Sequence, residues 1–411
     1  IYMIKKLIDD NKIHDFAQKV TTPFYIYSSD KIIENYNSYA RPLTEIDSLI
    51  CYSVKANSNL SILKMLSNNN SGFDVVSKGE IERVLLAGGD AEKIVFSGVG
   101  KTMDEIEFGI AKNILCFNVE SLDELKSISE VASSLNKRAN ISIRVNPSID
   151  PKTHPYITTG LSENKFGIHE NEIFDAYKMA KDLDNLNIVG IDYHIGSQIT
   201  DLQPFVDSAT KVLEIVHALK EMKINLSHID VGGGLGITYK DEKSIKRESF
   251  LDKLIEIISP TDLKLIVEPG RSIVGDAGLL VTKILNIKNS GDKNFAIVDA
   301  AMNDLLRPPL YNAHHRIKNI SKPSNSEEAI YDVVGPVCET TDYLGKDRKL
   351  SIEKGDYLVV EDVGAYGFSL SSNYNSRPRI AEYILLEDEI KLIRSREDFS
   401  NLILDESDLM I

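Results

Sequence analysis

The sequence predicts an α/β fold, a (β/α)8 TIM barrel, joined to a second, mainly antiparallel β domain. Eight short β-branched runs lie between Leu49 and Glu268, and amphipathic helical stretches separate them. This alternation implies a parallel sheet with crossover helices, and its count and size match an eight-stranded barrel. After about Gly275 the helical periodicity fades and turn clusters separate the apolar runs, which predicts the β domain. A doubly wound open sheet is the alternative architecture.

The predicted barrel strands are apolar runs that end in Gly, Ser, Asn or Asp, which is typical of buried parallel strands. They are Leu49–Val54, Phe73–Val76, Lys93–Phe96, Ile114–Val119, Asn140–Val145, Ile188–His194, His228–Val231 and Lys264–Glu268. Between them, apolar residues recur at the spacing of one helix face. This spacing predicts helices over Glu80–Ala87, Asp123–Leu135, Glu172–Leu183, Pro204–Glu221 and Ser249–Ile258.

The β domain combines both ends of the chain. Its predicted strands are Gly278–Leu285, Phe295–Val298, Ala329–Val334, Tyr357–Val360 and Ile380–Leu386. The early run Phe24–Ser28 precedes the first barrel strand, so we assign it to the same domain. The predicted boundaries are therefore 31–277 for the barrel, and 1–30 with 278–411 for the β domain.

Composition excludes several classes of protein. Of 411 residues, 42% are apolar and 27% charged, which is typical of a globular chain and not of a disordered one. No run approaches the roughly 18 apolar residues of a membrane span, and the charged start is not a signal peptide. The net charge of −15 argues against nucleic acid or an anionic membrane as a partner. Three widely spaced cysteines favour a reducing, cytoplasmic location.

The candidate functional residues follow the predicted strands, because the carboxyl ends of barrel strands line the active site. They are Lys55, Asp74, Arg144, His194, Ser197, Gly232, Gly233, Gly234, Glu268, Gly270 and Arg271. None has metal-ligand spacing, and no metal is expected. The remaining histidines, including His314 and His315, are interpreted as solvated or structural.

Lys55 follows an apolar strand and would emerge inside the barrel mouth. An unpaired buried ammonium tends to lose its proton, and a neutral amine is a Schiff-base nucleophile for an aldehyde. Taken alone, a lysine at this place is more often a side chain that extends from a strand end toward water.

The glycines at 232–234 expose backbone N–H groups after strand seven, where barrels commonly bind phosphate, although a tight structural turn has the same sequence. Ser197 offers a hydroxyl for the same phosphate. Glu268 ends the last strand and could hold a proton on a ring nitrogen. His194 offers a flat ring that could stack on a cofactor, although a lone histidine at such a place is more often a core residue. Together these groups meet the needs of pyridoxal phosphate, the expected cofactor, to which we also assign Asp74 and Arg144.

From about Thr22 to Glu382 the chain resembles the diaminopimelate decarboxylases, fold-type III pyridoxal-phosphate enzymes with the alanine racemase-like fold of the ornithine decarboxylases. The motifs that carry the resemblance are YSVKAN around Lys55, HIGSQ at 194–198, GGGLG at 232–236, EPGR at 268–271, DLLRPPLY at 304–311, GPVCETTD at 335–342, GAYG at 364–367 and YNSRPR at 374–379. Their number makes the resemblance specific, although each motif alone is not.

The resemblance implies a homodimer with shared active sites. Cys338 and Glu339 of each subunit would reach into the active site of the other subunit. It makes Lys55 the cofactor lysine and places Tyr366 near cofactor and substrate. Arg271, Arg307 and Tyr311 could bind a distal carboxylate of the substrate, and Glu339 a distal ammonium. Outside its motif, Arg307 would be interpreted as an ordinary ion-pair residue. Cys338 is a candidate proton donor, whereas Cys51 and Cys116 are interpreted as core residues.

The implied activity is decarboxylation of meso-diaminopimelate to L-lysine and CO2, the last step of lysine biosynthesis. The alternatives are a decarboxylase of another basic amino acid or a carboxylated polyamine, and a non-catalytic relative that binds a protein. The intact Lys55, Glu268 and Cys338 argue against the last. Asp192 stands where a His is common in the family, and Pro309, Thr340 and Thr341 also depart from the pattern.

Overall fold

The computed structural model describes residues 8–150, 165–321 and 326–406. The chain divides into two compact units, Asn35–Thr238 with Lys243–Ile273, and Ile1–Glu34 with Tyr239–Glu242 and Val274–Ile411. Their bounds lie near the predicted boundaries at 31 and 277, except that Tyr239–Glu242 joins the β unit. Whether each unit folds as a separate domain stays a prediction.

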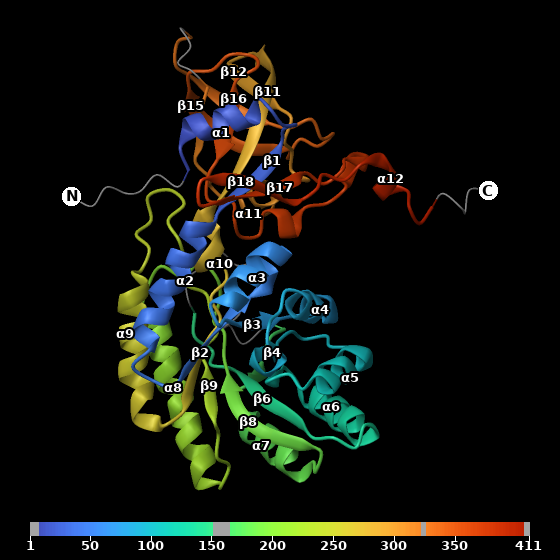
Figure 1. The fold of residues 1–411 in the computed structure, drawn as a ribbon. Helices are drawn as coiled ribbons and strands as arrows, with labels where there is room; N and C mark the ends of the chain where they lie inside the picture. Colours follow the sequence, from blue (N-terminus) through green and yellow to red (C-terminus); the bar gives the residue numbers. More distant parts are fainter. Residues whose placement is uncertain (1–7, 151–164, 322–325, 407–411) are drawn as a thin grey trace. The chain divides into compact units, whose positions relative to one another are not determined.

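The first unit is a closed parallel barrel, as predicted (Figure 1). Its strands are β2 (Ser48–Ser53), β3 (Gly72–Val75), β4 (Ile94–Phe96), β5 (Cys116–Val119), β6 (Ala139–Asn146), β8 (Leu186–Asp192), β9 (His228–Asp230) and β10 (Lys264–Val267). The order β5-β4-β3-β2-β10-β9-β8-β6 closes through β5–β6 pairing, and every pair is parallel. The alternative of an open sheet is therefore wrong. The short β7 (Ile168–His169) extends the sheet beside β6.

The five predicted helices are present with small shifts of their ends. The helices of this part of the chain are α2 (Ser29–Leu43), α3 (Leu60–Asn68), α4 (Lys78–Leu86), α5 (Met103–Lys112), α6 (Leu122–Ser134), α7 (Ile173–Asp182), α8 (Gln203–Glu221), α9 (Arg247–Ile258) and α10 (Arg271–Val274). Helices α2, α3 and α5 were not predicted. The α5 signal was nevertheless in the sequence, because Thr102 and Glu105 form a capping box at its start.

The second unit is a mainly antiparallel β sheet with short helices, which confirms the predicted fold class. Its strands are β1 (Phe24–Ser28), β11 (Gly278–Ser290), β12 (Lys293–Val298), β13 (Ile317–Asn319), β14 (Ala329–Val334), β15 (Tyr343–Leu350), β16 (Tyr357–Val360), β17 (Ala381–Leu386) and β18 (Glu389–Arg394), and its helices are α1 (Asp10–Ala17), α11 (Arg307–Tyr311) and α12 (Phe399–Leu402). Strand β1 pairs antiparallel with β11 and parallel with β17, so both ends of the chain enter one sheet. Strands β13, β15 and β18 were not predicted. Strand β13 has only three residues, and β15 and β18 are rich in charged residues.

Each unit has its own apolar core. In the barrel, Cys51, Val95, Cys116 and Ile266 pack together and are fully buried, which agrees with the interpretation of both cysteines as core residues. In the β unit, the core includes Phe24, Ile26, Leu279 and Val281. Among the described helices, none combines the length and apolarity that crossing a bilayer requires.

Gly190 on β8 is a position where the barrel tolerates no side chain. Its register partner His228 is buried, and a Cβ at Gly190 would lie 2.1 Å from the His228 Nε2 atom. We predict that Gly190→Ala lowers the free energy of unfolding by about 1–3 kcal/mol, because a buried ring must move.

Gly79→Ala in helix α4 is the matched control, because its Cβ would meet only the Ser77 hydroxyl, at 3.9 Å. It should leave stability unchanged or raise it by up to about 1 kcal/mol. Urea midpoints compare the two variants, and equal midpoints would contradict the packing argument.

Candidate active site

The first element of the site is a pair formed by Lys55 and Asp74. Lys55 lies in the 3-10 turn that follows β2, and Asp74 lies on the neighbouring strand β3. The Lys55 Nζ donates to the Asp74 Oδ2 at 2.6 Å; the lysine side chain is 37% exposed, whereas that of Asp74 is buried. The expectation of an unpaired, buried ammonium is therefore wrong: Lys55 is paired and reaches solvent.

Ser53 connects this pair to the last barrel strand. Its hydroxyl lies 2.9 Å from the Asp74 Oδ2 and 3.0 Å from the backbone oxygen of Glu268. The Ser53 backbone N–H also donates to the Pro269 oxygen. Strands β2, β3 and β10 thus hold Lys55 in a defined place at the strand ends.

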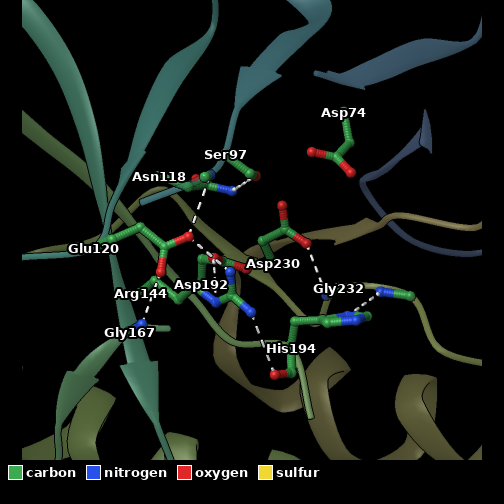
Figure 2. A network of polar contacts seen from close by, with 12 residues as sticks. Asp74, Ser97, Asn118, Glu120, Arg144, Gly167, Asp192, His194, Asp230 and Gly232 are labelled. Atoms are coloured by element: carbon green, nitrogen blue, oxygen red, sulfur yellow. Dashed lines mark hydrogen bonds and ion pairs between the residues drawn. The ribbon is translucent and has the colours of Figure 1, made fainter. Parts of the chain in front are cut away.

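Arg144 on β6 organises a second, buried group of charges (Figure 2). Its guanidinium donates to the Glu120 Oε1 at 2.7 Å and lies 3.8 Å from the Asp192 Oδ2. Glu120 also accepts from the backbone N–H groups of Gly98 and Gly167. These two carboxylates raise the pKa of Arg144 against the opposing effect of burial, so that it stays charged.

His194 lies against the glycine loop, Gly232–Gly236. Its Nδ1 atom accepts a hydrogen bond from the Gly233 N–H at 3.2 Å, which leaves the proton on Nε2 (Figure 2). Burial lowers the pKa of His194 well below its ordinary range, and the positive charges of Arg144 and Lys55 lower it further. The ring is therefore neutral.

The glycine loop has a backbone that only glycine allows. Gly232 and Gly234 have φ angles of +65° and +104°, and a Cβ at Gly233 would lie 2.2 Å from the backbone oxygen of Glu268. Across the same strand ends, the Arg271 guanidinium donates to the Ser197 hydroxyl at 3.0 Å. The structure thus brings Ser197 and Arg271 together.

Three buried carboxyl groups, Asp192, Asp230 and Glu268, form the carboxyl cluster. Each offers an oxygen within 4.8 Å of the others. Burial is the largest cause that raises their pKa values, well above the ordinary range for Asp192 and Glu268 and to about 6 for Asp230. The cluster could hold protons or a cation, and the raised pKa values favour protons.

The predicted residues of the β unit lie in three places. Arg307 and Tyr311 lie on α11, where Arg307 is buried and Tyr311 half-buried. Cys338 and Glu339 are exposed in a turn before β15, where Tyr374 donates to Glu339 at 2.5 Å. Tyr366 is half-buried with a φ of +56°, an unfavourable conformation for a tyrosine that must be stabilised by its surroundings.

The candidate site predicted from the sequence does not include Glu120, Asp230 or Glu80. Glu120 directly follows β5, so the strand-end rule could have found it. Asp230 ends β9, and its carboxylate accepts from the Gly232 N–H at 2.9 Å. Burial raises the pKa of Glu80 to about 7, against the opposing effects of a hydrogen bond from the Val76 N–H and of Lys55, whereas the sequence showed Glu80 only as the start of a predicted helix.

Comparison with known proteins now defines the class. The family model for the pyridoxal-dependent decarboxylases, pyridoxal binding domain, matches residues 29–275. The chain is a pyridoxal-dependent decarboxylase, and its cofactor is pyridoxal phosphate.

Within this class, several relatives that match over nearly the full chain are diaminopimelate decarboxylases. Diaminopimelate decarboxylase of Haemophilus influenzae is 47% identical over 399 residues, which cover 97% of this chain and 96% of the relative. That of Vibrio cholerae is 49% identical over 389 residues, covering 94% and 93%. The crystal structure of diaminopimelate decarboxylase from Helicobacter pylori with L-lysine matches with a TM-score of 0.93 and 47% identity, covering 97% and 100%. The chain belongs to the diaminopimelate decarboxylase family.

The residues present fit pyridoxal phosphate. The Glu268 Oε1 is buried and has no hydrogen-bond partner among the described residues, so a protonated ring nitrogen would satisfy it. The glycine loop with Ser197 and Arg271 offers donors for a phosphate, and Lys55 offers an amine for an aldehyde.

We predict that the carboxyl cluster gives the cofactor-free protein a distinct pH dependence. Burial raises the pKa of Asp230 to about 6 in the folded protein, whereas the pKa of an aspartate in the unfolded chain is about 4. A carboxyl group with a raised pKa stabilises the folded state below the unfolded pKa, and this contribution is lost as pH rises through the folded pKa.

The free energy of unfolding of the wild type, relative to Asp230→Asn, should therefore fall by about 1–3 kcal/mol between pH 4.5 and pH 7. Asn keeps an oxygen for the Gly232 N–H. Urea unfolding at both pH values measures the difference, and a constant difference would contradict the assignment.

Proposed function

We propose that this chain catalyses the decarboxylation of meso-diaminopimelate at its D-configured centre, giving L-lysine and CO2. The observation that carries the proposal is the coincidence of Lys55, the glycine loop and the unsatisfied Glu268 carboxylate in a member of this family. In the reaction, the bond between the D-centre and its carboxyl carbon breaks, CO2 leaves, and a proton takes its place.

When bound, pyridoxal phosphate supplies an aldehyde that condenses with amines and a ring that accepts the electron pair left by CO2. The protein's part is to hold that ring and keep its nitrogen protonated. We propose that the Glu268 carboxylate accepts a hydrogen bond from the ring N–H, because burial and the neighbouring Asp230 and Asp74 make its negative charge unfavourable without a partner. His194, neutral and fixed by Gly233, provides the stacking face.

Lys55 and Asp74 form the proton-transfer pair of the proposal. Asp74 is buried and lies 2.6 Å from the Lys55 amine, so it can hold the ammonium in place and accept its hydrogen bond. Arg144 balances the negative charges of Glu120 and Asp192. It also donates a longer hydrogen bond, of 3.5 Å, to the His194 backbone oxygen.

The substrate residues are proposed from their chemistry. Arg271, Arg307 and Tyr311 carry donors that suit the distal carboxylate, and Glu339 suits the distal ammonium. A substrate with an amino acid at both ends uses both kinds of group, whereas a simple diamino acid would leave the arginines without a role. Tyr366 is proposed to contact cofactor and substrate.

A homodimer with shared sites is part of the proposal. Cys338 and Glu339 are exposed on their own subunit, which makes both available to a second copy. Cys338 or Lys55 would return the proton to the carbon that lost CO2. The three unpaired cysteines support a reducing, cytoplasmic setting.

We predict that Lys55→Ala abolishes CO2 release from meso-diaminopimelate and the visible absorbance of the lysine-bound cofactor, because no other group can replace the amine. Lys64→Ala, on the exposed face of α3, is the control and should retain both. Absorbance and CO2 release are measured with pyridoxal phosphate present. Full activity in Lys55→Ala would overturn the assignment, and a panel of other basic amino acids tests the alternative substrates.

If Cys338 is the proton donor and acts across the interface, we predict that Cys338→Ala loses activity and that mixing it with Lys55→Ala subunits restores part of it. A mixed dimer contains one site with both wild-type residues if the thiol crosses the interface. Subunit exchange is verified by differential tagging. Exchanged dimers that stay inactive would show that Cys338 does not act across the interface.

A further inference from the structure

The guanidinium of Arg307 is closely surrounded by other side chains of the β unit. Arg307 is buried, and its Nη1 atom lies 2.9 Å from the Nε2 of His315. The face of the Tyr239 ring lies against the guanidinium, 4.6 Å from the ring centroid to the central carbon. Arg307, His315 and Tyr239 all belong to the same compact unit.

The hydrogen bonds of His315 determine which of its nitrogens carries the proton. Its Nδ1 atom lies 2.9 Å from the backbone oxygen of Glu361, which can only accept, so Nδ1 carries the hydrogen. An arginine can only donate, so the Nε2 atom must be the acceptor for Arg307. The imidazole is therefore neutral in this arrangement. His315 is fully buried, which corrects the expectation of a solvated residue but not that of a structural one.

Tyr239 completes the packing around both groups. Its ring meets that of His315 edge to face, with centroids 5.2 Å apart and planes at 81°. The Tyr239 backbone N–H donates to the Glu242 Oε1 at 2.7 Å, which anchors the turn that carries it. A ring face attracts a guanidinium without neutralising it. Arg307 is thus oriented from one side by a neutral acceptor and from another by an aromatic face.

We propose that His315 is a positioning residue, which together with Tyr239 sets the orientation of Arg307 for the distal carboxylate of the substrate. The proposal rests on the proposed function, because it takes Arg307 as the ligand of that carboxylate. A neutral partner suits this role better than an acidic one. A carboxylate in place of His315 would pair with the guanidinium in the same planar geometry as the substrate and compete with it.

The test compares two substitutions of His315 in the holoenzyme. His315→Gln keeps an amide N–H for the Glu361 oxygen and a carbonyl oxygen for Arg307, whereas His315→Phe keeps the ring and loses both hydrogen bonds. In His315→Phe, KM for meso-diaminopimelate should rise at least about tenfold while kcat changes less than threefold, because a hydrogen bond to a charged group supports binding. His315→Gln should recover most of the affinity.

Binding of two small molecules provides a second readout. L-lysine carries the carboxylate that Arg307 is proposed to bind, and pentane-1,5-diamine lacks it. Calorimetry should show weaker L-lysine binding to His315→Phe and unchanged diamine binding. His314→Ala is the matched control, since the His314 ring contacts Arg348; it should bind both molecules like the wild type.

The outcomes separate this proposal from the proposed function. A wild type that neither releases CO2 from meso-diaminopimelate nor binds L-lysine refutes both. An active wild type whose His315→Phe variant keeps its KM, or loses both ligands equally, refutes the positioning role alone. If His315→Phe does not fold, Tyr239→Leu removes the aromatic face instead, and a KM unchanged from wild type there is equally decisive.

Discussion

Compensation of buried negative charge is the constraint on which the barrel mouth depends. Parallel strands in a closed barrel bring their carboxyl ends together, and here that arrangement buries Asp74, Asp192, Asp230 and Glu268 near one another. Buried charges are unfavourable unless they are paired, protonated or bonded to a ligand. Arg144 offsets Glu120 and Asp192, and Lys55 offsets Asp74, yet one oxygen of each of the four carboxyl groups has no hydrogen-bond partner among the described residues. The proposed cofactor would supply a partner for Glu268 and so reduce this excess of negative charge.

In each compact unit a neutral histidine accepts a hydrogen bond from a group that the proposed site uses. In the barrel, a neutral His194 accepts from the glycine loop, and in the β unit a neutral His315 accepts from Arg307. Such contacts orient a group without cancelling the charge or donor that a ligand needs. Both histidines, His194 and His315, therefore act as hydrogen-bond acceptors, and neither has metal-ligand spacing.

Much of the fold and of the barrel site could be predicted from the sequence. The eight strands were visible because buried parallel strands are continuous apolar runs, and the strand-end rule located Lys55, His194, the glycine loop and Glu268. The charged strands β15 and β18 were not visible, because strands with exposed faces lack an apolar run. The burial of His315 was also hidden, since a histidine in a polar stretch looks the same in sequence whether it is exposed or buried.

The sequence by itself determined the barrel, the β domain, the family and the residues that suit the cofactor, because these follow from local periodicity and from short motifs. Only the tertiary structure decided how those residues are paired. It joined Lys55 to Asp74, placed Arg144 between Glu120 and Asp192, and brought Tyr239 from a remote part of the chain to the pair formed by Arg307 and His315. Such pairings depend on distances between strands and loops that are remote in sequence, and no local pattern encodes them.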